Sequence, residues 1–502
     1  MPTTPSPVTA ALARARSSEP PGPDLPPRPA ARRPRGRDGG LPVPATLDPL
    51  LRHSVAGHRL RPVPSAGALH PVDLHLLAGA GSGVGLPAGQ YAYDPVGHRL
   101  HPAGPAPATA PGDTAGGVFA VLRAAPGRTV AHYRHRGWPL TLLDTGHTVA
   151  ALVAAGAPAY CLDLAARSLP EPRDGRPGED PTIPLAVVRL TADGDPGAWV
   201  RAWDADGDPG AWIRASDARV SVTPWDRAPD ARASVTSWAR ASVTPRPPAS
   251  DTRAPATPRP CSPDTRTAAP PPEPAHPDLE QAYRVLRVLA DAGTPHGTWH
   301  TDHRRAPRAV VTARRSADPG TLAASGTPDD DMLLHVLGAA RAGAPTGPRW
   351  YLATGGPRPA LLTARAGRLR TEARGPVLPT LAAWAAGQGW IARTGAVLLA
   401  AGCPSRASPA RVRRDHLRAG YGVGHAHLAA TALGLAARPV GSWQQADLGA
   451  ALGGPAGEVW IVHGLAFGTR SPADVTDLTE PPGLAGPGPA PAPRTPEDTD
   501  PA

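Results

Sequence analysis

Apolar residues gather in two long regions of the chain, over residues 46–192 and 277–476. In the first region, apolar residues at helical spacing, such as Leu142 and Val149, predict a core helix over 138–160. Short apolar runs that end at Gly or Pro predict strands and short helices around it, the clearest at 72–79, 89–95, 117–124 and 183–190. We therefore expect one folded domain here.

The second region shows the same mixture of patterns. Residues 279–293 carry apolar side chains on one helical face and end at Gly293, which predicts an amphipathic helix. The remaining runs predict strands at 309–312, 350–354, 394–401 and 458–467, and helices at 332–342, 377–387 and 411–435. A second folded domain is expected here.

Three further segments are rich in proline and lack this periodicity. Residues 1–45 are expected to form a disordered Pro/Arg-rich arm, and residues 477–502 a disordered tail. Residues 193–276 contain short repeats, such as ADGDPGAW at 192–199 and again at 205–212. Because units this short cannot bury a face, this segment is predicted to be a linker.

The charge of the chain resembles that of a nucleic-acid-binding protein, but its composition does not support that class. The formal net charge is +10 at pH 7, and a strongly basic balance is typical of such proteins. All basic residues other than His are Arg, and Lys and Asn are absent, which a GC-rich genome explains. We therefore predict no nucleic-acid partner, while an acidic peptide partner stays open.

Cysteine usage and hydropathy restrict the class further. The three cysteines, Cys161, Cys261 and Cys403, are odd in number and widely spaced. This excludes a disulfide scaffold and a zinc site built from Cys, and it fits a reducing compartment. No run approaches the ~18 consecutive apolar residues of a membrane span, and the N-terminus lacks the apolar core of a secretory signal. A cytoplasmic protein without membrane contact is expected.

Three segments carry candidate chemistry. In the first, Arg52 and Ser54 form a compact pair of phosphate donors, and Pro64–Gly67 form a small-residue turn that lets a ligand approach backbone N–H groups. The second, residues 132–147, combines His, Tyr and Trp side chains and leads into the predicted core helix. In the third, three glycines within 420–424 make a helix narrow on one side, as a flat ring or another helix requires.

These segments resemble the nitroreductase-type flavoprotein superfamily and, within it, the SagB-type azoline dehydrogenases of ribosomal peptide modification. RPVPSAGALHPVDLHL at 61–76 matches the family's Arg, Pro-Ser-Ala-Gly turn and apolar strand, and GQYAYDPVGHRL at 89–100 matches its next element. HLRAGYGVGHAHLAATALGLAARPVG at 416–441 is similar to the family's flavin-side helix and loop, and GEVWIVHGLAFGTR at 457–470 to its last strand. The resemblance occurs once in each apolar region.

The resemblance implies an α+β, nitroreductase-like fold in two tandem copies that form an intramolecular pseudo-dimer. Members of the superfamily hold FMN between two protomers, so one FMN site built from both halves is expected. The residues that the resemblance places at FMN are Arg52, Ser54, Pro64, Ser65, Ala66, Gly67, His425, Pro439, Val440, Gly441 and Arg470.

The activity that the resemblance implies is FMN-dependent oxidation of peptide thiazolines or oxazolines to thiazoles or oxazoles, as in thiopeptide-like products. The family's catalytic Lys-Tyr pair aligns with His132 and Tyr133, and because the chain has no Lys, His132 is the candidate base beside Tyr133. Loss of catalysis in the first half is the alternative. The implied partners are an azoline-containing precursor peptide and a cyclodehydratase complex, and homodimer formation stays open. A flavin reductase of nitro or enone compounds and a non-catalytic partner protein also remain open.

Other histidines are expected to be structural. Three of them have a spacing that resembles metal ligands: His296, His300 and His303. Gly297 and Thr298 disfavour a helix between them and no Cys or Glu lies close by, so no metal site is predicted. His147 is expected to cap a helix or pack within it.

Overall fold

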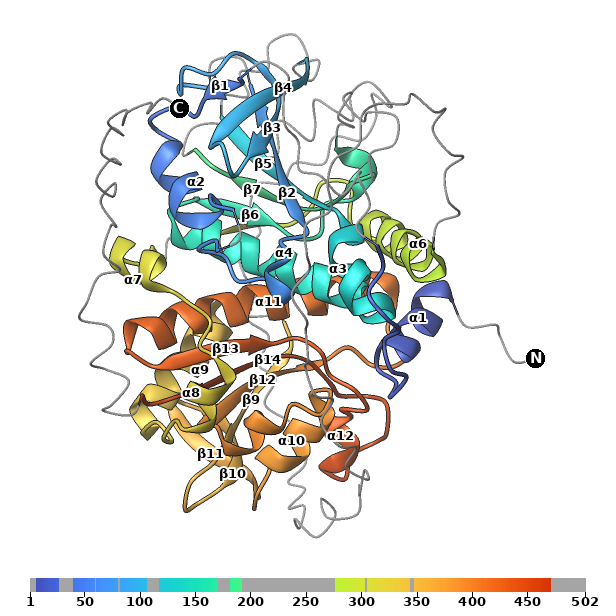
Figure 1. Ribbon diagram of the computed structural model, residues 1–502, viewed down its shortest axis with the longest axis vertical. Helices are drawn as coiled ribbons and strands as arrows, with labels where there is room; N and C mark the ends of the chain where they lie inside the picture. Colours follow the sequence, from blue (N-terminus) through green and yellow to red (C-terminus); the bar gives the residue numbers. More distant parts are fainter. Residues whose placement is uncertain are drawn as a thin grey trace, which may run out of the picture.

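The computed structural model describes residues 6–26, 39–58, 60–79, 82–105, 117–169, 181–191, 276–302, 305–343 and 347–470 (Figure 1). The predicted C-terminal tail, and the predicted linker apart from its last residue, lie outside the described residues. Among the described residues, no helix combines the length and the apolar character needed to cross a membrane.

The first sheet has eight antiparallel strands in the described part of the chain. Their order across the sheet is β1 (Leu41–Pro42), β4 (Arg99–Pro105), β3 (Gly89–Asp94), β2 (Val72–Ala78), β5 (Val118–Ala124), β7 (Ile183–Arg189), β6 (Ala159–Cys161) and β8 (Trp299–Thr301). Strand β5 is buried along its whole length, and β2 and β7 nearly so, which fits the predominance of apolar residues in their sequences. The runs at 72–79, 89–95 and 117–124, predicted as strands or short helices, form β2, β3 and β5, and the strand predicted at 183–190 is confirmed as β7.

The second sheet has six antiparallel strands among the described residues. Their order is β11 (Arg368–Arg374), β10 (Ala360–Arg365), β9 (Arg349–Thr354), β12 (Ala396–Gly402), β14 (Trp460–Gly468) and β13 (Ala436–Val440). This order matches β4-β3-β2-β5-β7-β6 of the first sheet strand for strand. The two sheets therefore belong to two copies of one domain, as expected.

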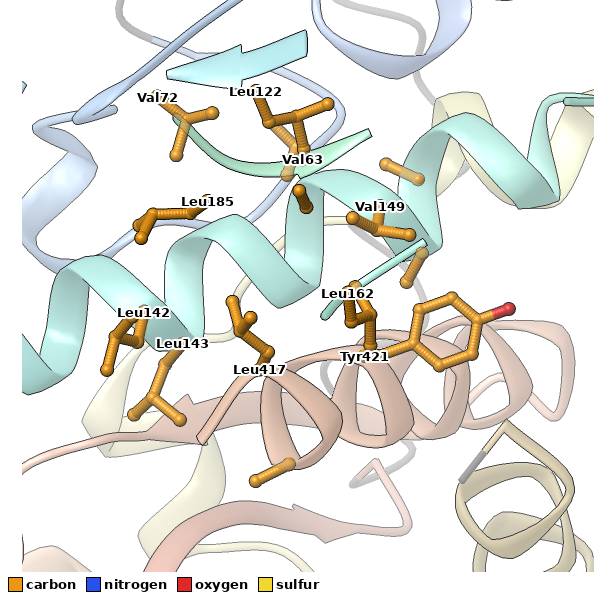
Figure 2. Packing of buried hydrophobic residues seen from close by; sticks show 14 of the residues in the cluster. Val63, Val72, Leu122, Leu142, Leu143, Val149, Leu162, Leu185, Leu417 and Tyr421 are labelled. Atoms are coloured by element: carbon orange, nitrogen blue, oxygen red, sulfur yellow. The ribbon is translucent and has the colours of Figure 1, made fainter. Parts of the chain in front are cut away.

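Two long helices lie against each other between the sheets, α4 (Gly137–Ala154) and α11 (Pro409–Ala432) (Figure 1). Leu142 and Leu143 of α4 and Leu417 of α11 occupy the space where the helices meet (Figure 2). They belong to one buried apolar cluster that includes residues from both sheets. The two copies thus share a core, since apolar area buried between them stabilises both.

Two glycines allow this close approach of the helices. A Cβ on Gly146 would lie 2.2 Å from the carbonyl oxygen of Leu417, and a Cβ on Gly420 would lie 2.2 Å from that of Leu143. Each helix therefore brings its backbone onto the backbone of the other. The narrow helix face predicted around Gly420 is occupied by the other half of the molecule.

Part of the second half is built into the first. Helix α6 (Pro277–Asp291) packs against α3 (Pro126–Tyr133), α4 and β7, and β8 pairs with β6 at the edge of the first sheet. The structure therefore corrects the domain boundary predicted at residue 277. The helix was predicted from its amphipathic spacing, but spacing does not say which sheet an apolar face will cover.

The N-terminal arm contains a helix, α1 (Pro7–Ala15). The Ser6 hydroxyl accepts a hydrogen bond from the Thr9 N–H and caps its first turn. Val8 and Leu12 are buried, and α1 packs against α6. The prediction of a disordered arm is wrong for these residues, because one apolar helical face is enough to dock them on the core.

The other α-helices of the described residues are α2 (Asp48–Ser54), α7 (Arg308–Ala313), α8 (Pro319–Ala323), α9 (Asp330–Gly343), α10 (Leu378–Trp384) and α12 (Leu448–Ala451). The strand predicted at 309–312 is wrong, since these residues lie in α7. Val311 is the buried residue of this helix, and it packs with Ala154 and Leu428. A short β-branched run favours a strand, but tertiary contacts decided the outcome here.

Candidate active site

A cavity of about 880 Å³ lies between the two halves. Its walls come from α3, α4 and the loop after α2 in the first half, and from the loop after α7 and the end of β13 in the second. Pockets for small-molecule ligands typically have volumes of about 300–1,000 Å³. The cavity can therefore accept a cofactor-sized molecule, and both halves are needed to form it.

One wall is the predicted turn at residues 64–67. Gly67 has a φ of +59°, in the left-handed region that favours glycine. The Ser65 hydroxyl donates to Asp144 Oδ2 at 2.7 Å, and the Ala66 N–H lies 3.2 Å from the same carboxyl group. A buried carboxyl of α4 thus fixes the turn at the cavity.

His132 and Tyr133 end α3 at the cavity, and their environments differ. A Cβ on Gly67 would lie 3.2 Å from the Tyr133 hydroxyl, which places the phenol directly beside the turn. Burial raises the pKa of Tyr133, so the phenol keeps its proton at neutral pH. The His132 side chain is 52% exposed, and its Nδ1 lies 3.0 Å from Asp24 Oδ1 in the N-terminal segment. Both predicted catalytic residues line the cavity, with Tyr133 more deeply placed.

The second half contributes Pro439, Val440 and Gly441 to the opposite wall. A Cβ on Gly441 would lie 2.6 Å from Leu140 Cδ2 of α4, so this backbone passes directly over the first half. These three residues and the turn at 64–67 are distant in sequence, and the fold brings them to the same cavity.

Five Arg side chains make the cavity positive: Arg61, Arg136, Arg314, Arg315 and Arg438. Arg314 is 5% exposed and donates to the carbonyl oxygens of Arg61 and Pro62. Its Nη1 has no hydrogen-bond partner within the described part of the chain. Burial lowers the pKa of Arg314 to about 10, which still leaves it charged at neutral pH. A buried guanidinium N–H without a partner favours an anion such as phosphate.

Four of the predicted FMN contacts do not line the cavity: Arg52, Ser54, His425 and Arg470. Arg52 pairs with Asp48 one turn earlier in α2, at 2.6 Å. The Ser54 hydroxyl donates to the Leu50 carbonyl at 2.7 Å, within the same helix. His425 is buried in α11, where its ring meets the Tyr421 ring edge-on at 4.7 Å. Local partners thus occupy the side chains of Arg52 and Ser54, the pair suggested for phosphate binding.

Asp144 and His463 line the cavity but were not predicted as site residues. Asp144 lies three residues before His147, a spacing that places both on one helical face. His463 interrupts an otherwise apolar strand, where a buried polar group is costly without a partner. Both residues could have been recognised from the sequence, because each is a polar residue within an element that is otherwise apolar.

The histidines with metal-like spacing lie elsewhere. His300 is in β8, where its ring stacks on Tyr160 with 5.4 Å between centroids. His303 lies outside the described residues. Within the described ranges, no three or more His, Cys, Asp and Glu side chains are placed to hold a metal ion.

Comparisons with known proteins bear on the fold. No protein-family model and no curated protein matches the chain. A structure described as a nitroreductase from Anabaena variabilis aligns with 93% of this chain and 100% of its own, at 15% identity and a TM-score of 0.58. A Desulfovibrio desulfuricans protein of the same description, in complex with FMN, aligns with 34% of this chain and 95% of its own, at 24% identity and a TM-score of 0.23. A chain of the E. coli microcin synthetase McbBCD complex, with truncated pro-MccB17 bound, aligns over 36% and 71%, at 19% identity and a TM-score of 0.21.

The first of these likenesses decides the fold, because it spans nearly the whole chain with a TM-score above one half. The other two cover only part of the chain. Together with the repeated strand order of the two sheets, it shows that this chain has a nitroreductase-like fold, present in two tandem copies.

Proposed function

We propose that this protein is an FMN-dependent dehydrogenase of the SagB type, which oxidises thiazoline or oxazoline rings of a peptide to thiazoles or oxazoles. The observation that carries the proposal is the cavity between the halves. There the turn at 64–67 and Tyr133 of one half face residues 439–441 and Arg314 of the other. The nitroreductase-like fold and the resemblance of the motifs support it. A precursor peptide as substrate and a cyclodehydratase complex as partner belong to the same proposal.

The cavity residues suit FMN. A flat isoalloxazine ring must lie close to backbone, and Gly67 and Gly441 are wall positions on opposite sides that lack a side chain. A phosphate needs cations, and the buried Arg314 guanidinium has an N–H that no protein group satisfies in the described structure. When bound, FMN would supply the two-electron chemistry, while the protein supplies orientation, proton handling and electrostatics.

We further propose one FMN per chain, because the halves differ where a second site would lie. In the first half β6 takes the place of β13, and the buried Arg413 guanidinium donates to the Leu164 carbonyl just beyond β6, at 2.8 Å. In the second sheet, His463 pairs with Ala400, the fifth residue of β12. The fifth residue of β5 pairs with Ala186 instead. The first sheet therefore lacks the histidine that the second sheet brings to the cavity.

The residues at the end of α3 suit different tasks in this proposal. Tyr133 keeps its proton, so its hydroxyl can donate a hydrogen bond inside the cavity. His132 is partly exposed and its Nδ1 lies 3.0 Å from Asp24 Oδ1, so it lies at the cavity edge where water reaches it. The two neighbouring residues therefore differ in depth, with Tyr133 inside the cavity and His132 at its edge.

The absorption spectrum of the purified protein tests the cofactor, and mass spectrometry tests the reaction. We expect a flavin spectrum and, after denaturation, one FMN released per chain. With oxygen and an azoline-containing peptide, the peptide mass should fall by two hydrogen atoms for every ring oxidised. A colourless protein that cannot be reconstituted with FMN would refute the proposal. Reduction of nitro or enone compounds by NAD(P)H, without loss of peptide mass, would favour the reductase instead.

A further inference from the structure

Three buried acid–base side chains form a continuous row along the cavity, and the proposal above leaves them without a role. Asp144 and His147 lie on α4 and His463 on β14, and each is at most 3% exposed. His147 Nδ1 lies 3.7 Å from Asp144 Oδ1, and the two Nε2 atoms of His147 and His463 are 2.9 Å apart. The row runs from the first half into the second, and all three residues line the cavity.

The hydrogen-bond partners determine which ring nitrogen carries each proton. Burial lowers the pKa of His147 to about 3 and that of His463 well below its usual value, so both rings are neutral. The Val440 carbonyl, 3.0 Å from His463 Nδ1, can only accept, so this nitrogen carries the proton. His463 Nε2 therefore accepts from the His147 Nε2–H. The remaining lone pair of His147, on Nδ1, is the one on the side of Asp144, and no described group forms a hydrogen bond with this nitrogen. The Pro64 carbonyl acts on the same ring without meeting hydrogen-bond geometry.

This lone pair affects the Asp144 carboxyl. A nitrogen lone pair beside a carboxyl group can accept a hydrogen bond from the protonated carboxyl. It repels the carboxylate anion. Burial raises the pKa of Asp144 to about 7, although hydrogen bonds from the Ser65 hydroxyl and the Ala66 N–H favour the anion. A base is most effective when its pKa lies near the working pH. The buried Asp144 carboxyl, with its raised pKa, meets this condition.

The other titratable groups around the row keep a constant charge near neutral pH. Arg314 is the cation that acts most strongly on His147, and it helps to keep that ring neutral. Tyr133, which interacts with Asp144, stays protonated. His416 and His427 of α11 are neutral because burial lowers the pKa of both. Within this group of side chains, Asp144 is the one whose charge changes between pH 6 and 8, about one unit either side of its pKa.

We propose that Asp144 is the catalytic base of the cavity, and that His147 and His463 are positioning residues that direct a lone pair to its carboxyl. The proposal rests on the function proposed above. One ring C–H bond breaks and its proton passes to the Asp144 carboxylate, which becomes the acid. Bound FMN would supply the two-electron oxidation, taking up the second hydrogen with the electron pair of its bond, so that the electrons lost by the ring are balanced.

The alternative is that Asp144 merely clamps the turn at residues 65–66. A clamp needs the hydrogen bonds from Ser65 and Ala66, but it does not depend on His463, which reaches Asp144 only through His147. A substitution of His463 therefore separates the two roles. If it changes the ionisation of Asp144, the row acts as a unit.

Infrared spectroscopy of the purified protein without substrate measures this ionisation directly. We expect a protonated-carboxyl band that titrates with a midpoint near pH 7 and disappears in Asp144→Asn. In His463→Leu, the proton of His147 can move to Nδ1, from which it donates to the Asp144 carboxylate. The midpoint should then fall by about 1–2 pH units, which corresponds to the free energy of one charge-assisted hydrogen bond. His463→Gln can still accept from His147 and should restore it. His416→Leu, at a buried histidine bonded to the Val412 carbonyl of its own helix, should leave it unchanged.

The acid limb of the pH profile of azole formation should shift with the infrared midpoint in the same variants. An unchanged midpoint in His463→Leu would overturn the proposal, as would a band that survives in Asp144→Asn. If His463→Leu does not fold, ¹⁵N NMR of the unmodified protein decides, and a proton on His147 Nδ1 would overturn it. A protein that shows the titration but oxidises no azoline would refute the proposed function and leave the ionisation of Asp144 established.

Discussion

Tyr133 and His132 are neighbours in sequence, but their different burial separates what each substitution should do. Tyr133→Phe removes a hydroxyl that faces the cavity beside Gly67, and we expect it to lower azole formation by about 10²-fold, as loss of a positioned proton donor does. His132→Ala should lower it by less than about tenfold, because water can replace an exposed side chain. Turnover measured at equal FMN content tests both, and equal losses in the two variants would contradict the assignment.

The raised pKa of Asp144 predicts a pH-dependent contribution to stability. The folded protein holds this proton up to about pH 7, whereas the unfolded chain releases it near pH 3.8. The extra stability is complete below the lower value and is lost as the pH rises to the higher one. Relative to Asp144→Asn, which does not titrate, the protein should lose about 4 kcal/mol of unfolding free energy between pH 4 and pH 8.

Urea unfolding of both proteins across this range measures the difference, with folding confirmed by circular dichroism. All other titrating groups are common to the two proteins, so their contributions cancel. A difference that does not vary with pH would show that Asp144 ionises normally.

At the residue scale, local motifs were predictable and long-range partners were not. The turn at 64–67 could be identified because its small residues are adjacent in sequence. The hydrogen bond between His147 and His463 joins residues 316 positions apart, and no local pattern reports it. Arg52 was predicted to bind phosphate, but Asp48, one turn away on the same helix, pairs with it.

At the scale of elements, the crossing of α4 and α11 predicts how a single methyl group would act. Gly146→Ala places a Cβ 2.2 Å from the Leu417 carbonyl oxygen, so the helices must separate. We expect a loss of about 1–3 kcal/mol in unfolding free energy, the usual cost of overpacking. Release of FMN should accompany it, because α4 lines the cavity.

Gly338→Ala is the matched control for this substitution. Gly338 lies in α9, and a Cβ there would meet nothing within 4 Å. Because Ala favours a helix over Gly by up to about 1 kcal/mol, this variant should be slightly more stable than the parent. Destabilisation of both variants to the same extent would show that the close approach at Gly146 is not the cause.

Helices and strands with strong periodicity were predictable, but the sheet that each would join was not. The pattern of α6 correctly indicated an amphipathic helix, yet its apolar face covers the first half. The segment at 308–313 has the β-branched composition of a strand and forms α7 because Val311 packs against two helices. Periodicity indicates that one face of an element is buried. It does not indicate which sheet or helix that face packs against.

At the scale of the whole molecule, the shared core predicts that the halves stay together without a covalent connection. A protease site introduced between residues 193 and 275 would allow the chain to be cut after folding. We expect both fragments to elute together in size-exclusion chromatography and to retain FMN, because the contact of α4 with α11 and the pairing of β8 with β6 need no intact chain. Separation of the fragments in dilute buffer would contradict this expectation.

The joining of two copies in one polypeptide has an evolutionary consequence. In a homodimer every substitution appears twice, so a residue that improves one active site is also imposed on the other. Here corresponding strand positions hold Ala186 in one copy and His463 in the other. One copy can accumulate side chains for chemistry while the other accumulates side chains for rigidity. A homodimer cannot do this, because both of its protomers have the same sequence.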